Sequence, residues 1–334
     1  MLFVIGLPGG FVDWCVAVAA RCAERASGPI GIIHANTLEE ISLDVIKTGA
    51  TRALVASRHP GYQMRAALTQ AAQNFVVAYD DPRVALADLV LHHGFGMEAA
   101  LQATASSCAA ISGYLTAPGA LALSSDHDWR EPTGAAMAIA RHLQLDIGDA
   151  DVAELIGELA EANPGSSRQQ ANAWFNALSQ AERETVDGTL APYTGRTEDN
   201  QWSPIVWTGD LFFIGDRPTE RARGTIDITG RARCLVHGPH IMLPPGSWSV
   251  SVALDFSREA VEHEFLVEVW TSHQLASGTL LPQQVGSITI TLHFALDELN
   301  EHPVSIRLST VRAAFDGAFA VHEATLIRAH SPEA

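Results

Sequence analysis

The sequence predicts two domains: a three-layer α/β sandwich around a parallel sheet, followed by an all-β antiparallel sandwich. In the first part, short apolar runs alternate with alanine-rich stretches of helical periodicity, a pattern typical of a parallel sheet covered by helices on both faces. In the second part, apolar and polar residues alternate with a period of two, as in strands with one buried face. We place the first domain at 1–195 and the second at 202–331, which the length of 334 residues allows.

Five apolar runs are predicted as the strands of the parallel sheet: 2–5, 30–34, 52–57, 75–79 and 120–123. Helical periodicity predicts helices at 13–27, 82–92, 96–116, 132–145, 149–162, 167–178 and 180–190. Two helices have a capping-box signature at their start, Thr37 with Glu40 and Ser179 with Glu182. Because crossovers between parallel strands are right-handed, the carboxyl ends of all strands share one edge, where ligands bind.

Strict alternation in the second part predicts strands at 248–256, 288–294 and 304–308. Turn signals such as Pro244-Pro245-Gly246 and Asp316-Gly317 separate such segments. Seven or eight short strands of this kind predict an antiparallel β-sandwich of jelly-roll or immunoglobulin-like type.

The charge of the chain restricts its partners. It has 38 acidic and 21 basic residues, a net charge of −17, and Lys47 is its one lysine. Both parts are acidic, with 23 acidic and 12 basic residues in 1–201 and 15 and 9 in 202–334. Nucleic acids and anionic membranes need clustered positive charge, so we expect neither as the main partner. A single anionic small molecule held by a few arginines remains compatible with this composition.

No run of 18 apolar residues is present, so we predict no transmembrane segment. The four cysteines form neither a CxxC pair nor a zinc spacing, which is typical of buried thiols in a reducing compartment: Cys15, Cys22, Cys108 and Cys234. We therefore expect a cytoplasmic protein. No metal site is predicted, because neither His92-His93 nor the pair His237 and His240 has accompanying ligands. A homodimer is left open.

The first strand-to-helix turn, Pro8-Gly9-Gly10, is a candidate anion site. Glycines let backbone N–H groups approach a phosphate or sulfate at the N-terminus of a helix. Asp13 follows closely and repels an anion. The alternative is a tight turn with no ligand, in which Asp13 is the N-cap of the helix.

Over residues 1 to about 160 the chain resembles the sulfotransferase superfamily, whose fold is P-loop-like. Those proteins begin with a strand and a loop of the type Pro-Lys/Arg-Ser-Gly-Thr-Thr, often followed by Trp, that holds the 5′-phosphosulfate of the donor. Pro8 and Trp14 are in register with this loop, and Gly9 stands at its basic position. Three residues replace its hydroxyl side chains: Gly10, Val12 and Asp13.

Two later segments extend the resemblance. Residues 54–60 are similar to the strand that ends in Arg-x-Pro, where Arg58 matches the arginine that contacts the donor's 3′-phosphate, although Ala66 replaces the serine expected further on. Residues 121–145 are similar to the family's strand, acidic loop and helix. For an active enzyme, the resemblance implies 3′-phosphoadenylyl sulfate bound by Arg58 and the turn Pro8, Gly9 and Gly10.

Catalysis stays open at this point. Sulfuryl transfer needs positive charge at the leaving group, and no basic residue precedes Arg21. His34, at the end of the second strand, and Asp126, in the acidic loop, are the candidates for a catalytic base. The alternatives are a structural role for His34 and helix capping by the acidic loop.

The segment Gly238 to Trp248 resembles a strand-turn-strand found in β-sandwich accessory modules of bacterial glycan-synthesis proteins. Sugars stack on exposed aromatic rings, and Trp270 alternates onto the face opposite the apolar positions 265, 267 and 269, so it is expected to point outward. We predict that Arg231, His240 and Trp270 bind substrate. Two further tryptophans, Trp202 and Trp207, are additional candidates.

These observations favour a sulfotransferase-like protein of bacterial surface-polysaccharide biosynthesis or modification, acting on a carbohydrate or glycan acceptor through a carbohydrate-binding-type sandwich. If it is active, it is a transferase. The first alternative is a non-catalytic glycan-binding or scaffold protein whose donor site has decayed. The second is a glycosyltransferase that uses a nucleotide sugar.

Overall fold

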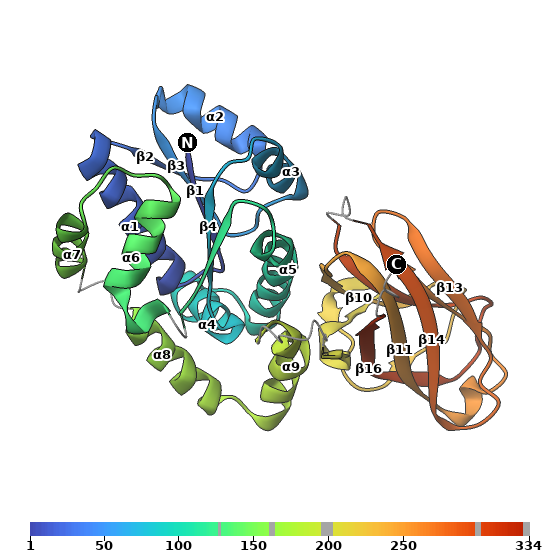
Figure 1. Cartoon of the computed structure of the whole chain (residues 1–334). Helices are drawn as coiled ribbons and strands as arrows, with labels where there is room; N and C mark the ends of the chain where they lie inside the picture. The colour runs from blue at the N-terminus through green and yellow to red at the C-terminus, as the bar shows by residue number, and fades with distance from the viewer. Residues whose placement is uncertain (126–127, 160–163, 195–202, 298–301, 330–334) are drawn as a thin grey trace. The chain divides into compact units, whose positions relative to one another are not determined.

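The computed structural model describes residues 1–125, 128–159, 164–194, 203–297 and 302–329. The chain divides into two compact units, Met1–Leu178 and Ser179–Ala334, and Figure 1 shows the helical first unit and the β-rich second unit.

The first unit contains the predicted parallel sheet, in the order β2-β3-β1-β4-β5. Every pair of neighbouring strands in it is parallel: β1 (Leu2–Gly6), β2 (Gly31–His34), β3 (Ala53–Ser57), β4 (Phe75–Tyr79) and β5 (Ala120–Ser124). The central strand β1 is buried from Phe3 onward, because helices cover both faces of the sheet. The three-layer α/β prediction is confirmed.

The helices of the first unit are α1 (Gly10–Ser27), α2 (Leu38–Thr48), α3 (Tyr62–Gln70), α4 (Pro82–His93), α5 (Met97–Leu115), α6 (Pro132–His142), α7 (Asp149–Glu158) and α8 (Pro164–Ala177). Helices α1, α6 and α7 lie together on one side of the sheet, and α3 and α5 lie on the other (Figure 1). The main apolar core joins β1 to helices α1 and α6, with residues such as Val4, Trp14 and Ile139 each at most 2% exposed.

Two details of the helices differ from the sequence prediction. Helix α1 begins at Gly10 with Gly9 as its N-cap, and no side chain caps it, so the reading of Asp13 as N-cap is wrong: Asp13 lies within the first turn. Helix α3 was not predicted, because Pro60-Gly61 marks a break in the chain and here also starts a new helix at Tyr62. Both predicted capping boxes, at Thr37 and Ser179, are present.

The second unit begins with helix α9 (Gln180–Leu190), which we had expected in the first domain. The reason is its packing on β6 (Ile205–Thr208): the hydroxyl groups of Thr185 and Thr208 are 3.0 Å apart. Gly188 also lies against Val206, where a Cβ atom would come within 3.1 Å of the valine side chain. The helix therefore belongs to the compact unit that contains β6.

Two antiparallel sheets form the rest of the second unit and confirm the β-sandwich class. The six-stranded sheet has the order β13-β12-β15-β10-β7-β8, with β7 (Phe213–Ile214), β8 (Arg217–Arg221), β10 (Cys234–Ile241), β12 (Phe265–Trp270), β13 (Gln274–Leu280) and β15 (Val304–Thr310). The five-stranded sheet has the order β14-β11-β16-β6, and β9 also pairs with β16; its bounds are β9 (Ile226–Asp227), β11 (Gly246–Phe256), β14 (Gly286–Leu296) and β16 (Ala318–Arg328). Strands beyond the expected seven or eight are short ones, such as β7 and β9, that are too brief to show alternation.

Aromatic side chains fill the space between the two sheets. Phe256, Phe265 and Phe319 form a cluster with ring centroids 4.9 to 6.3 Å apart. Trp248 is also core, and its Nε1 donates to the carbonyl of Pro244 at 3.0 Å. Since Phe265 and the two alternate residues that follow it are fully buried, the intervening side chains of β12 lie on the outer face of the six-stranded sheet.

Candidate functional sites

The turn between β1 and α1 is built for close packing. A Cβ atom at Gly6 would collide with the carbonyl oxygen of Ala78 on β4 and approach within 2.8 Å of Val12. Gly9 has φ +135°, a conformation that favours glycine. Pro8 and Gly9 are both buried. The predicted donor-binding turn therefore exists as a tight, enclosed strand-to-helix connection.

Arg58 lies beside this turn, at the carboxyl end of β3. Its guanidinium donates to Asp13 Oδ1 at 2.7 Å, across the first turn of α1. The segment is held by Asn36, whose Oδ1 accepts from the backbone N–H groups of Arg58 at 3.2 Å and His59 at 2.9 Å. The structure thus brings the predicted Arg58 to the predicted turn, but its guanidinium contacts a carboxylate of the protein.

Of the two candidates for a catalytic base, the structure describes His34 alone. His34 ends the edge strand β2 and is exposed, and its strand neighbour in β3 is Ala56. Asp126 lies outside the described residues. No catalytic pair is therefore assembled from the residues that the structure describes.

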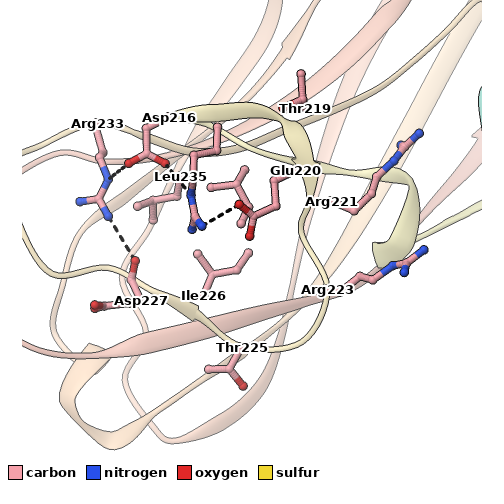
Figure 2. Close-up of a pocket in the computed structure, with 12 residues that line it drawn as sticks. Asp216, Thr219, Glu220, Arg221, Arg223, Thr225, Ile226, Asp227, Arg233 and Leu235 are labelled. Carbon is pink, nitrogen blue, oxygen red and sulfur yellow. Dashed lines mark hydrogen bonds and ion pairs between the residues drawn. The ribbon is translucent and has the colours of Figure 1, made fainter.

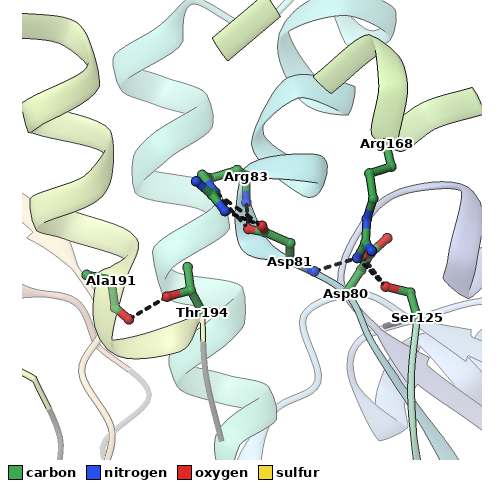
Figure 3. Close-up of polar contacts among 7 residues, drawn as sticks. All are labelled: Asp80, Asp81, Arg83, Ser125, Arg168, Ala191 and Thr194. Carbon is green, nitrogen blue, oxygen red and sulfur yellow. Dashed lines mark hydrogen bonds and ion pairs between the residues drawn. The ribbon is translucent and has the colours of Figure 1, made fainter. Parts of the chain in front are cut away.

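A buried polar cluster at the same edge was missed in the sequence. Asp80 follows β4 and is 7% exposed, and its Oδ1 accepts from Ser125 Oγ at 2.5 Å and from an Arg168 guanidinium nitrogen at 2.9 Å (Figure 3). Arg168 also donates to Ser125 Oγ at 2.7 Å. The cluster ties helix α8 to the ends of β4 and β5. The acidic pair Asp80-Asp81 directly after a predicted strand was the available signal.

The edge does not fit a phosphosulfate donor as it stands. The turn offers no charged or hydroxyl side chain before Asp13, and Asp13 itself adds negative charge. Lys47 is exposed and lies in the last turn of α2. Arg58, the cation nearest the turn by sequence resemblance, is already paired. No step of sulfuryl transfer follows from these residues.

The outer face of the six-stranded sheet gathers aromatic and arginine side chains. Across the strands, Arg221 of β8 is paired with Phe213 of β7, Phe213 with His237 of β10, and His237 with Arg307 of β15. Residues directly opposite on neighbouring strands share a face. With two neighbours, these side chains form what we call the aromatic–arginine face: Phe213, Arg221, His237, His240, Trp270 and Arg307.

The face has ordered contacts between its rings and its cations. The Phe213 and His237 rings stack with centroids 5.6 Å apart. The Arg221 guanidinium carbon lies 4.0 Å from the centroid of the Phe213 ring, and that of Arg307 lies 4.3 Å from the Trp270 ring. Such cation–π contacts are worth about 0.5–2 kcal/mol each and hold the guanidinium plane in place. The predicted Trp270 and His240 are brought together on this face.

His240 reaches the face through a backbone irregularity. The pairing of β10 with β15 shifts register between Pro239 and Ile241, and His240 has φ +63°, which is uncommon outside glycine. A bulge of this kind redirects a side chain. As a result His240 Nε2 and His237 Nδ1 share a hydrogen bond of 2.8 Å.

The two histidines favour their neutral forms. Burial, and then the positive charge of Arg307, lowers the pKa of His237 from its ordinary 6.5. Burial, and then the charges of His237, Arg307 and Arg221, lowers the pKa of His240. At neutral pH the pair therefore offers uncharged hydrogen-bonding groups between the two arginines.

The other predicted sugar-binding residues that the structure describes do not join the face. Trp207 is 0% exposed, so its expected role in binding is wrong; it fills the core on the inner side of β6. Arg231 is exposed in the loop before β10, where its carbonyl accepts from Arg233 at 3.5 Å. Trp202 lies outside the described residues.

A cavity of about 740 Å³ lies beside strands β7, β8 and β9. Figure 2 shows Arg233 beside Asp216, whereas Arg221 and Arg223 extend away from them. Arg233 pairs with Asp216 at 3.7 Å, and Arg217 pairs with Glu220 at 2.6 Å. Its lining contains no aromatic ring. The cavity thus lacks the flat apolar surface on which a sugar stacks, and the aromatic–arginine face is the better candidate for a binding site.

Within the described residues, no group of three or more His, Cys, Asp or Glu is arranged to hold a metal ion. All four cysteines are free, and three of them are buried; burial raises the pKa of the Cys22 thiol to about 11. No helix in the described part of the chain is long and apolar enough to span a membrane.

Comparisons with known proteins give structural matches alone. No family model matches the chain, and no curated protein matches it in sequence. Mouse sulfotransferase SULT7A1 complexed with PAP is 11% identical, with 59% of this chain and 85% of that chain covered and a TM-score of 0.39. Retinol dehydratase, solved with retinol and PAP, is 9% identical, with 59% and 82% covered and a TM-score of 0.40.

Carbohydrate-binding modules match the β-rich part. The module TmCBM61, solved with β-1,4-galactotriose, is 10% identical, with 38% of this chain and 88% of that chain covered and a TM-score of 0.25. A CBM36-1 domain of a xylanase from the hindgut metagenome of Trinervitermes trinervoides is 9% identical, with 39% and 100% covered and a TM-score of 0.27. The chain is thus similar to sulfotransferases in its α/β part and to carbohydrate-binding modules in its β-sandwich.

Proposed function

We propose that the protein binds a glycan on the aromatic–arginine face of its second unit. One observation carries the proposal: Trp270 and Phe213 lie on the same outer sheet face, each beneath an arginine, with His237 between them. Aromatic rings with polar groups beside them suit a pyranose, since its C–H faces pack on the ring while its hydroxyls hydrogen-bond to the flanking groups.

The setting of this binding is bacterial surface-polysaccharide biosynthesis or modification, in the cytoplasm. The sequence resemblances support this setting, because one part of the chain is similar to sulfotransferases and the other to modules of glycan-synthesis proteins. In this proposal the second unit holds the carbohydrate, and the first unit is a sulfotransferase-like body with an altered donor edge. The protein then acts as a glycan-binding or scaffold protein.

A glycan array tests the proposal directly. The full-length protein is expected to bind at least one class of bacterial polysaccharide, and Trp270→Ala is expected to weaken that binding roughly tenfold or more, through loss of a stacking surface. Phe315→Ala is the matched control, because Phe315 is an aromatic residue that is 96% exposed and lies outside the face. Equal loss in both variants, or no glycan bound at all, would contradict the proposal.

Binding of the sulfotransferase donor nucleotide is the second candidate function, and the position of Arg58 favours it. Its guanidinium lies against the first turn of α1, where the resemblance expects the donor, although Asp13 already pairs with it. Adenosine 3′,5′-bisphosphate, the donor's nucleotide product, tests this candidate, because a ligand that binds only the native state raises the melting temperature. A rise that is lost in Arg58→Ala would support a retained donor site. No rise at millimolar concentration would exclude it.

A further inference from the structure

Arg307 forms no ion pair with a carboxylate in the described part of the chain, although Glu268 lies opposite it in the sheet. Among the described residues, its contacts are cross-strand pairing with His237 and Glu268 and the position of its guanidinium over the Trp270 ring. The guanidinium has five N–H donors, and no acceptor in the described part of the chain takes them.

Several arginines of the same unit have an acceptor within the protein. Arg217, Arg233 and Arg312 pair with the carboxylates of Glu220, Asp216 and Glu264, and Arg328 donates to the backbone carbonyl of Pro245. Carboxylates are in excess in a chain of net charge −17, yet Arg307 forms no ion pair in the described part of the chain. Its guanidinium is partly exposed, so its donors bind water, and a ligand anion can replace that water with charged hydrogen bonds.

A second arginine points to the same chemistry. Arg221 also lies over an aromatic ring of this face, and the histidines between the two arginines are held in hydrogen-bonded contact with each other. The Trp270 ring positions the Arg307 guanidinium without neutralising it, because an aromatic ring carries no net charge, whereas Arg221 also donates to the backbone carbonyl of Leu211. The face therefore presents the cationic fork of Arg307 beside a stacking surface.

We infer that the glycan held by the aromatic–arginine face is acidic, with a carboxylate or sulfate group of a sugar unit bound by Arg307. The inference rests on the proposed function and specifies its ligand class. A guanidinium fork matches the two oxygens of such an anion, while the neighbouring Trp270 ring receives the sugar face. A neutral glycan would leave the Arg307 donors to hydroxyl groups alone.

The test compares each acidic polymer with its neutral counterpart of the same linkage. Polygalacturonate and its carboxyl-reduced form are one pair, and a sulfated galactan and its desulfated form are the other; binding by the full-length protein is measured by titration calorimetry. We expect one acidic polymer to bind roughly tenfold or more tighter than its neutral partner, as charged hydrogen bonds predict. The pair that shows the preference distinguishes carboxylate from sulfate.

Variants then assign the preference to a residue. Arg307→Gln is expected to abolish it, and Arg307→Lys to recover only part of it, because lysine keeps the charge but lacks the fork. Arg312→Gln removes one positive charge elsewhere in the unit, where Arg312 is 78% exposed, and is expected to leave the preference intact. If Arg307→Gln is too unstable to measure, Arg221→Gln must reduce the preference instead.

The outcomes separate the two proposals. Equal affinity for acidic and neutral polymers would overturn the acidic specificity and leave glycan binding standing. A preference that persists in Arg307→Gln would overturn the assignment to Arg307. Failure of every polymer in both pairs, together with an empty glycan array, would overturn both proposals.

Discussion

Arg58 and Asp13 form an ion pair of 2.7 Å that joins the end of β3 to the first turn of α1. The Asp13 carboxylate contacts the Arg58 guanidinium, which is the group that an anionic ligand would need. It therefore acts as an internal substitute for the anion, at a position where the resembling family has a hydroxyl side chain.

Replacing Asp13 by Asn is expected to expose the anion-binding capacity of Arg58. The side chains of Asp13 and Arg58 are 59% and 36% exposed, so loss of the pair changes stability by about 1 kcal/mol or less. Adenosine 3′,5′-bisphosphate is expected to raise the melting temperature of Asp13→Asn more than that of the unaltered protein. Asp149→Asn, at the exposed pair with Arg141, is the control. An equal response of all three proteins would show that Asp13 does not block the edge.

Removing Arg168 is expected to destabilise the first unit. Arg168→Ala leaves the buried Asp80 carboxylate with Ser125 and one backbone N–H, so we expect a loss of about 2–4 kcal/mol in the free energy of unfolding. Arg141→Ala breaks an exposed pair and is expected to cost about 1 kcal/mol or less. Urea unfolding of the full chain measures both, and similar losses for the two variants would contradict a structural role for the cluster.

The two capping boxes report on the boundary between the units. Thr37→Ala and Ser179→Ala each remove a side-chain cap, at a cost of about 1 kcal/mol. If α9 folds with the sandwich, calorimetry will show Thr37→Ala lowering the melting temperature of the first unit and Ser179→Ala that of the second. If both variants shift the same transition, α9 unfolds with the first unit and not with the sandwich.

The histidine pair predicts how the second unit responds to acid. Because the pKa values of His237 and His240 are lowered from 6.5 in the folded state, the unfolded state binds more protons once the pH falls below about 6.5. Stability is therefore fully present above that pH and is lost as the pH falls through the folded-state pKa values. Arg307 on the neighbouring strand β15 acts on both histidines, and Arg221 on β8 acts on His240, as fixed positive charges.

The double variant His237→Gln/His240→Gln is expected to flatten this pH dependence. Melting temperatures between pH 7.5 and about 5 give the measurement, and His273→Gln, an exposed histidine after β12, serves as the control. An unchanged slope in the double variant would assign the acid sensitivity to other groups.

Periodicity and capping were sufficient to predict both fold classes. Runs such as Phe75–Tyr79 are apolar throughout because both faces of β4 are buried, and the alternation of Phe265–Trp270 reflects one buried and one outer face. Short elements could not be predicted: β7 and β9 have two residues each, a single period of alternation, which is too short to establish a pattern. Helix α3 was not predicted, because Pro60-Gly61 is compatible both with the end of a strand and with the start of a helix.

Parts of the candidate sites could be predicted only where a general rule of the fold fixes the position of a residue. The rule that parallel strands end at one edge places Arg58 near the start of α1, where it contacts Asp13. The contact of Arg168 with Asp80 depends on how α8 packs against the sheet. That packing is tertiary structure, which no local pattern in the sequence predicts. The pairing of His237 with Arg307 depends on the register between β10 and β15, which no short pattern in the sequence encodes.

The single lysine has a practical consequence for measuring glycan binding. Lys47 is exposed on α2 of the first unit, and the second unit contains no lysine. Amine-reactive dyes and sensor-chip couplings therefore attach to no side chain of the aromatic–arginine face. A protein labelled or tethered in this way keeps the chemistry of that face intact, so surface-based affinity measurements on it report the native site.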